Sequence, residues 1–267
     1  MKTRAIALMI LLVSPLISAQ VKNFEEPFHF IGHRGASYLA PENTLASITL
    51  AWELGAVGAE CDVMLTSDNK VILFHDKNAK KLTGKNITVK EASWEQLKSL
   101  VIIPRETNRP EYNHETIPLL KDVLASIPED LVLVIEIKTG PEILPHLQEV
   151  IEEHWKSGQI SFIAFDFKTI KQAKALYPKV PCYYLSSFKS DINKHLEACV
   201  ESGLDGLDLR HNIIDQELVE QCHASGLDVW CWTVNDTETA QKMKDFGVSA
   251  VTTDRPAWLK NNLMIRK

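Results

Sequence analysis

The sequence predicts an α/β fold, a (β/α)8 barrel of the TIM type with an inserted capping segment after the third strand. Short apolar runs alternate with amphipathic helical stretches from Phe28 to Thr252. The runs are almost continuously apolar, which is typical of parallel strands whose outer face is covered by helices. The chain has 267 residues, the length of one such barrel, and contains no linker or internal repeat that would divide it.

Nine apolar runs are expected to form strands, at residues 28–31, 57–65, 71–74, 131–137, 160–165, 180–185, 206–209, 229–234 and 250–252. A simple barrel needs eight, and the run 71–74 is the exception. Its connector, residues 66–70, has no room for a helix and predicts a hairpin turn. The hairpin brings His75 back to within a residue or two of the Glu60–Asp62 stretch.

Helical periodicity fills the intervals between most of these strands. Leu45, Ile48 and Trp52 recur at helix spacing after a start signal at residues 43–44. Residues 77–130 break the rhythm, because they are polar and rich in proline, and we interpret them as an insertion that caps one end of the barrel. A short helix at 93–100 is expected inside it, since Ser-Trp-Glu-Gln matches a capping box.

Residues 1–19 are predicted to be a secretory signal peptide, because Lys2 and Arg4 precede an apolar run that ends near the small residue Ala19. The run is shorter than the roughly 20 residues that span a bilayer, so we expect no stable membrane anchor. The protein is then exported, to the periplasm or to the medium, and residues 20–267 form a single domain.

Charge and cysteine content narrow the classes of partner. Removing residues 1–19 takes the formal charge from −6 to −8, and an acidic surface excludes nucleic acid as a partner. The five cysteines are scattered singly without a CxxC pair, so buried free thiols are expected rather than a disulfide framework. Nothing in the sequence indicates a protein partner.

The tetrapeptide Gly32-His33-Arg34-Gly35 follows the first strand, where a barrel places its active-site loops. Histidine can transfer a proton near neutral pH, and the guanidinium of arginine can grip a phosphate or carboxylate. The two glycines are expected to let the backbone approach a ligand closely. By itself this tetrapeptide is also compatible with a structural histidine beside a turn.

Carboxylates at alternate positions indicate a metal site. Glu60 and Asp62 point to one face of their strand, and Glu136 and Lys138 share a face at the end of another. Buried carboxylates need a cation, and three of them form a hard oxygen site that suits one divalent ion, Mg²⁺ or Ca²⁺. A salt bridge from the pair to Arg34 or Lys138 at the barrel rim is the alternative.

Two histidines beside one cation fit phosphodiester hydrolysis. His33 and His75 can act as general base and general acid, while a metal and cationic side chains hold charge on the phosphoryl oxygens. By contrast, Phe162, Phe165 and Phe167 alternate along the chain and are predicted to pack within the barrel.

The ordered motifs together resemble the glycerophosphodiester phosphodiesterase family, of the phospholipase-like phosphodiesterase barrels. The resemblance rests on residues 33–35, 41–44, 60–63, 74–76, 136–138, 232–235 and 253–256, and spans nearly the whole chain after residue 30. It implies a small-molecule glycerophosphodiester substrate, cleaved to glycerol 3-phosphate and an alcohol.

The resemblance also implies roles for single residues. His33 and His75 are the acid and base, and Glu60, Asp62 and Glu136 bind the metal. Arg34 and Lys138 hold the phosphate, Glu42 supports the site, and Trp232 lines the pocket for glycerol or the leaving group. Two other classes remain open on the residues alone: a metal-dependent sugar isomerase on the same barrel, and a non-catalytic phosphodiester-binding protein.

Overall fold

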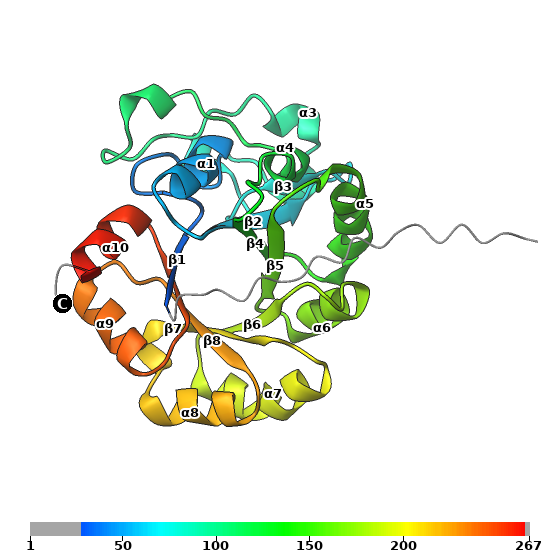
Figure 1. Ribbon diagram of the computed structural model, residues 1–267. Coiled ribbons are helices and arrows are strands. Elements are labelled where there is room, and N and C mark those ends of the chain that lie inside the picture. Colours follow the sequence, from blue (N-terminus) through cyan, green and yellow to red (C-terminus); the bar gives the residue numbers. More distant parts are fainter. Residues whose placement is uncertain (1–27, 265–267) are drawn as a thin grey trace, which may run out of the picture.

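Eight parallel strands close into a barrel in the computed structural model, which describes residues 28–264 (Figure 1). β1 (His29–Gly32) pairs with β2 (Gly58–Leu65) on one side and with β9 (Ala250–Thr253) on the other, and this double pairing closes the sheet. The strands between them follow in chain order: β4 (Val132–Ile137), β5 (Gln159–Ala164), β6 (Cys182–Ser186), β7 (Gly206–Arg210) and β8 (Asp228–Trp232). The predicted barrel is confirmed, and the predicted signal peptide at residues 1–19 lies outside the described residues.

The short strand β3 (Val71–Leu73) is the predicted hairpin partner of β2. It runs antiparallel to β2 with Leu73 opposite Val63. One residue further on, the amide of Phe74 donates to the carbonyl of Asp62 at 2.9 Å. The hairpin register predicted from residues 66–70 is therefore confirmed, and it delivers His75 to the same end of the barrel as Asp62.

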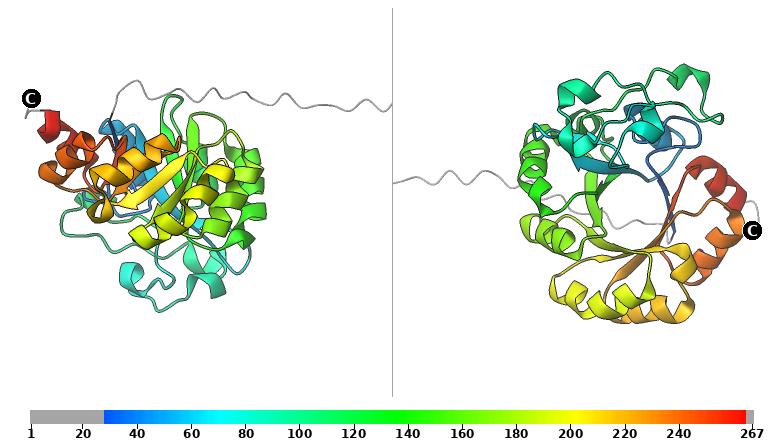
Figure 2. Two further views of the ribbon diagram at one scale, coloured as in Figure 1. Left: turned by 90° about the horizontal axis from the view of Figure 1, so that it is seen from below. Right: turned by 180° about the vertical axis from the view of Figure 1, so that it is seen from behind.

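Helices form an outer ring around the strands, as both figures of the fold show (Figures 1 and 2). Their amphipathic faces pack on the sheet, and Thr44 begins the first of them with a capping box to Ser47. The ring comprises α1 (Leu45–Glu53), α4 (Leu120–Leu124), α5 (Leu144–His154), α6 (Phe167–Leu176), α7 (Lys189–Glu201), α8 (Gln216–Ala224), α9 (Thr237–Asp245) and α10 (Pro256–Met264).

The segment between β3 and α4 carries the short helices α2 (Lys80–Thr83) and α3 (Trp94–Leu97) and two 3₁₀ turns, Val89–Glu91 and Pro110–Tyr112. It has its own small apolar core against β3, separate from the main core that contains α4. The capping box at Ser93 is present, but α3 ends three residues before the predicted position. The chain turns there because Val101 pairs with Thr116 across the segment.

The inserted segment packs against the loop between β1 and α1. The amide of Arg109 donates to the carbonyl of Leu39 at 2.8 Å, and the side chain of Asn108 donates to the carbonyl of Ser37 at 3.2 Å. The insertion therefore lies at the carboxyl-end rim of the barrel, next to the loop that carries His33.

Apolar residues fill both sides of the sheet. The main core lies between strands and helices, and a second cluster lies inside the barrel, where Tyr183 stacks on Trp230 with ring centroids 3.9 Å apart. All five cysteines are buried free thiols, as predicted. None of the helices within residues 28–264 has the length and apolar character needed to cross a membrane.

Candidate active site

A pocket opens at the carboxyl ends of the barrel strands and gathers most of the residues singled out from the sequence. Seven of the nine predicted site residues line it: His33, Arg34, Glu60, His75, Glu136, Lys138 and Trp232. The other two, Glu42 and Asp62, are buried directly behind Arg34, and both pair with its guanidinium. Closure of the barrel thus brings together side chains that are up to 199 positions apart in the chain.

The loop after β1 holds Arg34 in a left-handed backbone conformation, with φ of 53°. This turn aims the amide of Arg34 at the Glu60 carboxylate, to which it donates at 2.7 Å. Gly35 follows at φ of 81°, and a Cβ there would lie 2.3 Å from the backbone of Ser47. Gly35 is therefore required for close packing of the loop on α1, and the expectation that the two glycines let the backbone approach a ligand stays a prediction.

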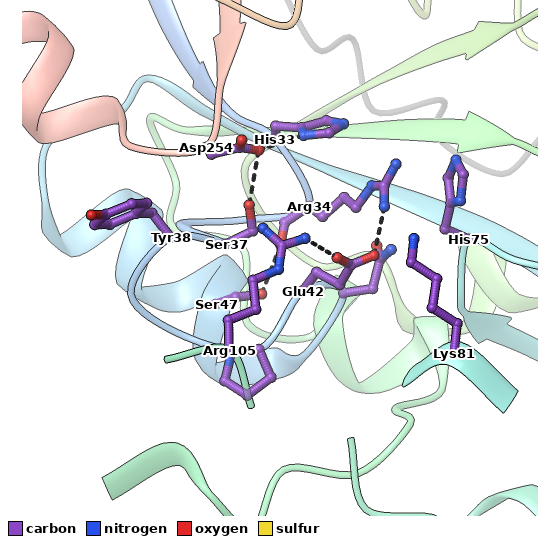
Figure 3. A network of polar contacts seen from close by, with 12 residues as sticks. His33, Arg34, Ser37, Tyr38, Glu42, Ser47, His75, Lys81, Arg105 and Asp254 are labelled. Carbon is purple, nitrogen blue, oxygen red and sulfur yellow. Dashed lines mark hydrogen bonds and ion pairs between the residues drawn. The ribbon is translucent and has the colours of Figure 1, made fainter. Parts of the chain in front are cut away.

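His33 is oriented by a carboxylate from the far end of the chain. Its Nδ1 donates to Asp254 Oδ1 at 2.7 Å, and Asp254 also accepts from Ser37 Oγ at 3.1 Å and Asn235 Nδ2 at 2.7 Å. Although burial alone would raise it, these hydrogen bonds hold the pKa of Asp254 well below its usual range. An ionised Asp254 keeps the proton on Nδ1, so Nε2 is the nitrogen left for the pocket (Figure 3).

His75 is held in a similar way by its neighbour. Its Nδ1 donates to Asp76 Oδ1 at 2.7 Å. Burial lowers the pKa of His75, Asp62 raises it, and Arg34 and Lys138 lower it further. Figure 3 shows His33 and His75 at the same end of the barrel as the Arg34 guanidinium. The pocket therefore contains two oriented imidazoles, as predicted.

Three carboxylates come together at the pocket wall, with Glu60 and Glu136 lining the pocket and Asp62 directly behind. Asp62 lies beside Glu136 in the strand register, and oxygens of Glu60, Asp62 and Glu136 lie within 4.8 Å of one another. Cys61, between the first two, points the other way into the core, as strand alternation predicts.

The electrostatics of this cluster call for a cation. Burial, then repulsion by Asp62 and the third carboxylate, raises the pKa of Glu60 well above its usual range, and burial and Asp62 likewise raise the pKa of Glu136. Burial opposes ionisation of Asp62 too, but Arg34 and Lys138 lower its pKa. Two buried oxygens, Glu60 Oε1 and Asp62 Oδ1, accept no hydrogen bond. The donor set fits a divalent ion that prefers oxygen ligands.

Arg34 and Lys138 lie against these carboxylates. The Arg34 Nε is 3.2 Å from Asp62 Oδ2 but outside hydrogen-bonding geometry, and its Nη1 donates to Glu42 at 2.5 Å. The Lys138 ammonium donates to Glu136 Oε1 at 2.6 Å and lies 3.5 Å from Asp62 Oδ1. The rim salt bridge considered from the sequence is therefore present, alongside carboxylate oxygens that it does not satisfy.

Sequence reasoning missed four residues of the site. Asp254 stands within the motif at 253–256 but received no role, and Arg105, from the insertion, pairs with the buried Glu42. Asn43 donates to Asp62 at 2.8 Å and accepts from its amide at 2.9 Å. Asp208 lines the pocket from β7. Asn43 and Asp254 lie inside the motifs at 41–44 and 253–256, and Asp208 is a polar residue inside the apolar run 206–209, whereas Arg105 left no signal in the sequence.

Phe165 corrects the prediction that all three alternating phenylalanines pack in the barrel. Phe162 is fully buried and Phe167 packs against the main core, but Phe165 is 42% exposed and lines the pocket. It contacts Trp232 edge to face, with ring centroids 5.6 Å apart. Its position at the end of β5 explains this, because the residues that follow a barrel strand form the pocket rim.

Comparisons with known proteins point to one family. The model of the glycerophosphoryl diester phosphodiesterase family matches residues 33–258. A glycerophosphodiester phosphodiesterase of Caldanaerobacter subterraneus is 30% identical over 242 residues, 89% of this chain and 97% of that protein.

Solved structures show the same likeness. A phosphodiesterase of Oleispira antarctica, in complex with the product sn-glycerol-3-phosphate, is 30% identical with a TM-score of 0.81, over 88% of this chain and 96% of that one. A glycerophosphodiester phosphodiesterase of Parabacteroides distasonis is 26% identical with a TM-score of 0.75, over 90% and 98% of the two chains.

Proposed function

Since the chain belongs to the glycerophosphoryl diester phosphodiesterase family, we propose that it cleaves glycerophosphodiesters to glycerol 3-phosphate and an alcohol with one divalent metal ion and two histidines. As a member of this family it is a phosphoric diester hydrolase. The sugar isomerase and the non-catalytic binding protein are thereby set aside. The observation that carries the finer proposal is the convergence of three carboxylates, two imidazoles and two cationic side chains on one pocket.

The metal is proposed to bind Glu60, Asp62 and Glu136. These three carboxylates raise one another's energy when buried, and the unsatisfied Glu60 Oε1 and Asp62 Oδ1 provide open acceptor positions. A bound divalent ion supplies Lewis-acid stabilisation of charge on a phosphoryl oxygen. The all-oxygen set favours Mg²⁺ or Ca²⁺ over zinc.

Arg34 and Lys138 are proposed to hold the phosphate. Arg34 lines the pocket, and its guanidinium is a planar, charged donor of the kind that holds phosphoryl oxygens. Glu42 supports this donor, because it accepts from Arg34 Nη1 and from Arg105 and so fixes the guanidinium from behind (Figure 3). Trp232 is proposed to line the part of the pocket that receives glycerol or the leaving group.

His33 and His75 are proposed to move the protons. With Nδ1 of each ring donating to Asp254 or Asp76, the two Nε2 atoms are the acceptor and donor positions for the reaction. One takes a proton from the attacking oxygen, and the other gives a proton to the departing alkoxide. Attack by water and attack by the glycerol 2-hydroxyl differ in their products, so trapping a cyclic phosphate and following solvent ¹⁸O distinguish them.

The test is release of glycerol 3-phosphate from glycerophosphocholine and glycerophosphoethanolamine, with and without EDTA, followed by addition of Mg²⁺ or Ca²⁺. Glu60→Gln keeps the shape of the side chain and removes its charge, so we expect it to abolish release. Glu115→Gln, a half-buried carboxyl outside the pocket, is the matched control and should keep activity. Full activity of Glu60→Gln, or full activity after exhaustive chelation, would contradict the metal proposal.

Export to the periplasm or the medium is also proposed, on the pattern of Lys2, Arg4 and the apolar run that follows. Amino-terminal sequencing of the mature protein from the producing cells tests it. A mature chain that begins near residue 20 supports export, and a chain that retains Lys2 and Arg4 contradicts it.

A further inference from the structure

One carboxyl group that lines the pocket has no role in the proposed function. It belongs to Asp208 on β7, whose neighbours in register are Leu185 on β6 and Trp230 on β8. Leu207 and Leu209 on either side face the outer core, so Asp208 points into the barrel. Its residue exposure is 1%, and it lines the pocket with the apolar side chains of Ile163 and Leu185.

The Asp208 side chain lacks a partner in the protein. Its Oδ1 is buried and accepts no hydrogen bond, and no hydrogen bond or ion pair from any residue between 28 and 264 reaches its carboxyl group. A buried carboxyl group without a partner is unfavourable. The absence of a partner is therefore informative, because it leaves the pocket as the only place from which one can come.

Asp228, another aspartate inside the barrel, differs from Asp208 because its carboxylate accepts several hydrogen bonds. Asp228 accepts from Trp230 Nε1 at 2.9 Å, from Tyr183 hydroxyl at 3.2 Å and from Ser249 Oγ at 2.7 Å. Asp228 begins β8 opposite Gly206, two residues nearer the amino ends of the strands than the level of Asp208, and its donors Tyr183, Trp230 and Ser249 do not line the pocket. Asp208 has none of this support and lies on the pocket side.

The charges around the pocket indicate what kind of group Asp208 receives. A phosphate is repelled by a carboxylate and is attracted to Arg34 and Lys138 on the other wall. A cationic head group would need the faces of Phe165 and Trp232, but the Lys138 ammonium already lies 5.7 Å from the centroid of the Phe165 ring. A neutral hydroxyl group is the donor that suits an unpartnered carboxyl oxygen beside apolar walls.

We propose that Asp208 accepts a hydrogen bond from a hydroxyl group of the glycerol moiety and so selects phosphodiesters of a polyol. Trp232 also lines the pocket, and its Nε1 donates to the backbone carbonyl of Asp208 at 3.3 Å. This hydrogen bond holds the indole ring of Trp232 next to Asp208. This inference rests on the proposed function and assigns the residue that recognises the glycerol moiety of its substrate. Burial, then Glu136 and Asp228, raises the pKa of Asp208, and a carboxyl in either protonation state keeps an acceptor oxygen.

The test is a binding comparison that involves no chemistry. Dissociation constants for glycerol 3-phosphate and for 1-propyl phosphate, which lacks both hydroxyls, are measured by calorimetry on the metal-loaded protein and on Asp208→Leu and Asp208→Asn. The wild type should prefer glycerol 3-phosphate. Asp208→Leu should reduce that preference about 3- to 10-fold, the range expected when one hydrogen bond from a hydroxyl group is lost.

Asp228→Asn is the matched control, because it changes a barrel aspartate that the pocket does not reach and should leave the preference unchanged. Asp208→Asn keeps the size of the side chain but replaces one acceptor oxygen by an NH₂ group, so it should lower the preference by a smaller factor, about threefold, and it serves if Asp208→Leu fails to fold. An unchanged preference in both Asp208 variants overturns the inference, as does a wild type that binds the two phosphates equally.

Two further results separate this inference from other readings. If Asp208→Leu binds fewer divalent ions per chain and keeps the preference for glycerol 3-phosphate, Asp208 holds a second cation and the inference is wrong. If the wild type releases no glycerol 3-phosphate from any diester, the proposed function fails. The binding preference then still reports separately on Asp208.

Discussion

Asp254→Asn is expected to remove most of the activity and to leave the fold intact. The Asp254 carboxylate accepts from Nδ1 of His33 at 2.7 Å and from the side chains of Asn235 and Ser37. An asparagine of the same shape places either an amide N–H or a weaker carbonyl acceptor against that ring nitrogen. When the N–H faces it, the ring proton moves to Nε2 and the histidine presents the wrong tautomer to the pocket.

The size of the loss follows from the step that His33 serves. A positioned acid or base contributes about 10²- to 10⁴-fold to the rate, so losing its orientation should lower kcat by about 10²-fold or more. KM should change less, because Asp254 does not line the pocket and acts through His33 as a positioning residue.

The assay compares kcat on glycerophosphocholine with kcat on a glycerol phosphodiester of p-nitrophenol. If His33 protonates the leaving oxygen, the loss is much smaller for p-nitrophenol, whose anion leaves without a proton. If His33 is the base, both substrates lose activity equally. Asp236→Asn is the control: it caps α9 outside the pocket, where asparagine is an equally good cap. Activity of Asp254→Asn within about threefold of the wild type on both substrates would refute the reasoning.

The same substitution has a stability effect whose sign depends on pH. Burial alone would raise the pKa of Asp254, but its hydrogen bonds from His33, Asn235 and Ser37 depress it below the unfolded value of about 4. Its stabilisation is present above that value and is lost as pH falls through the folded pKa. Urea denaturation should show Asp254→Asn less stable by about 1–3 kcal/mol at pH 7, with a smaller difference at pH 3.

Three further results are expected. Gly35→Ala should lower the free energy of unfolding by about 2 kcal/mol or more, since the new Cβ would meet the backbone of α1 at 2.3 Å. Gly203→Ala is also at positive φ but has open space around it, so it should lower the free energy of unfolding by only about 1 kcal/mol. Equal losses in urea denaturation would contradict the packing argument. Arg105→Ala should reduce kcat/KM about 3- to 10-fold with little change in the free energy of unfolding, because Arg105 is half exposed in its ion pair with Glu42 and Glu42 remains paired with Arg34. A loss of fold would show that the insertion depends on the Arg105–Glu42 pair. The five thiols should not react with a disulfide reagent at pH 8 until the protein unfolds, because all are buried and burial raises the pKa of Cys182 to about 12. Rapid labelling of the native protein would contradict this, because it would show that a thiol is accessible.

Residues that are close in the chain were predictable as parts of the site. Strand alternation alone places Glu60 and Asp62 on one face, and the five-residue connector 66–70 determines where His75 returns. The barrel itself followed from alternating apolar runs and helices, because a parallel sheet buried on both faces leaves that pattern in any sequence.

Closure of the barrel decided the rest. Asp254 reaches His33 across 221 positions because β9 pairs with β1, and Arg105 reaches Glu42 because the insertion folds back onto the loop after β1. The lack of a partner for Asp208 is likewise a property of the closed barrel. The sequence by itself determined the fold class and the local pairs, since these depend on backbone periodicity. Only the tertiary structure determined which distant side chains share hydrogen bonds and which buried group has none, because those depend on distances between strands that the chain order does not contain.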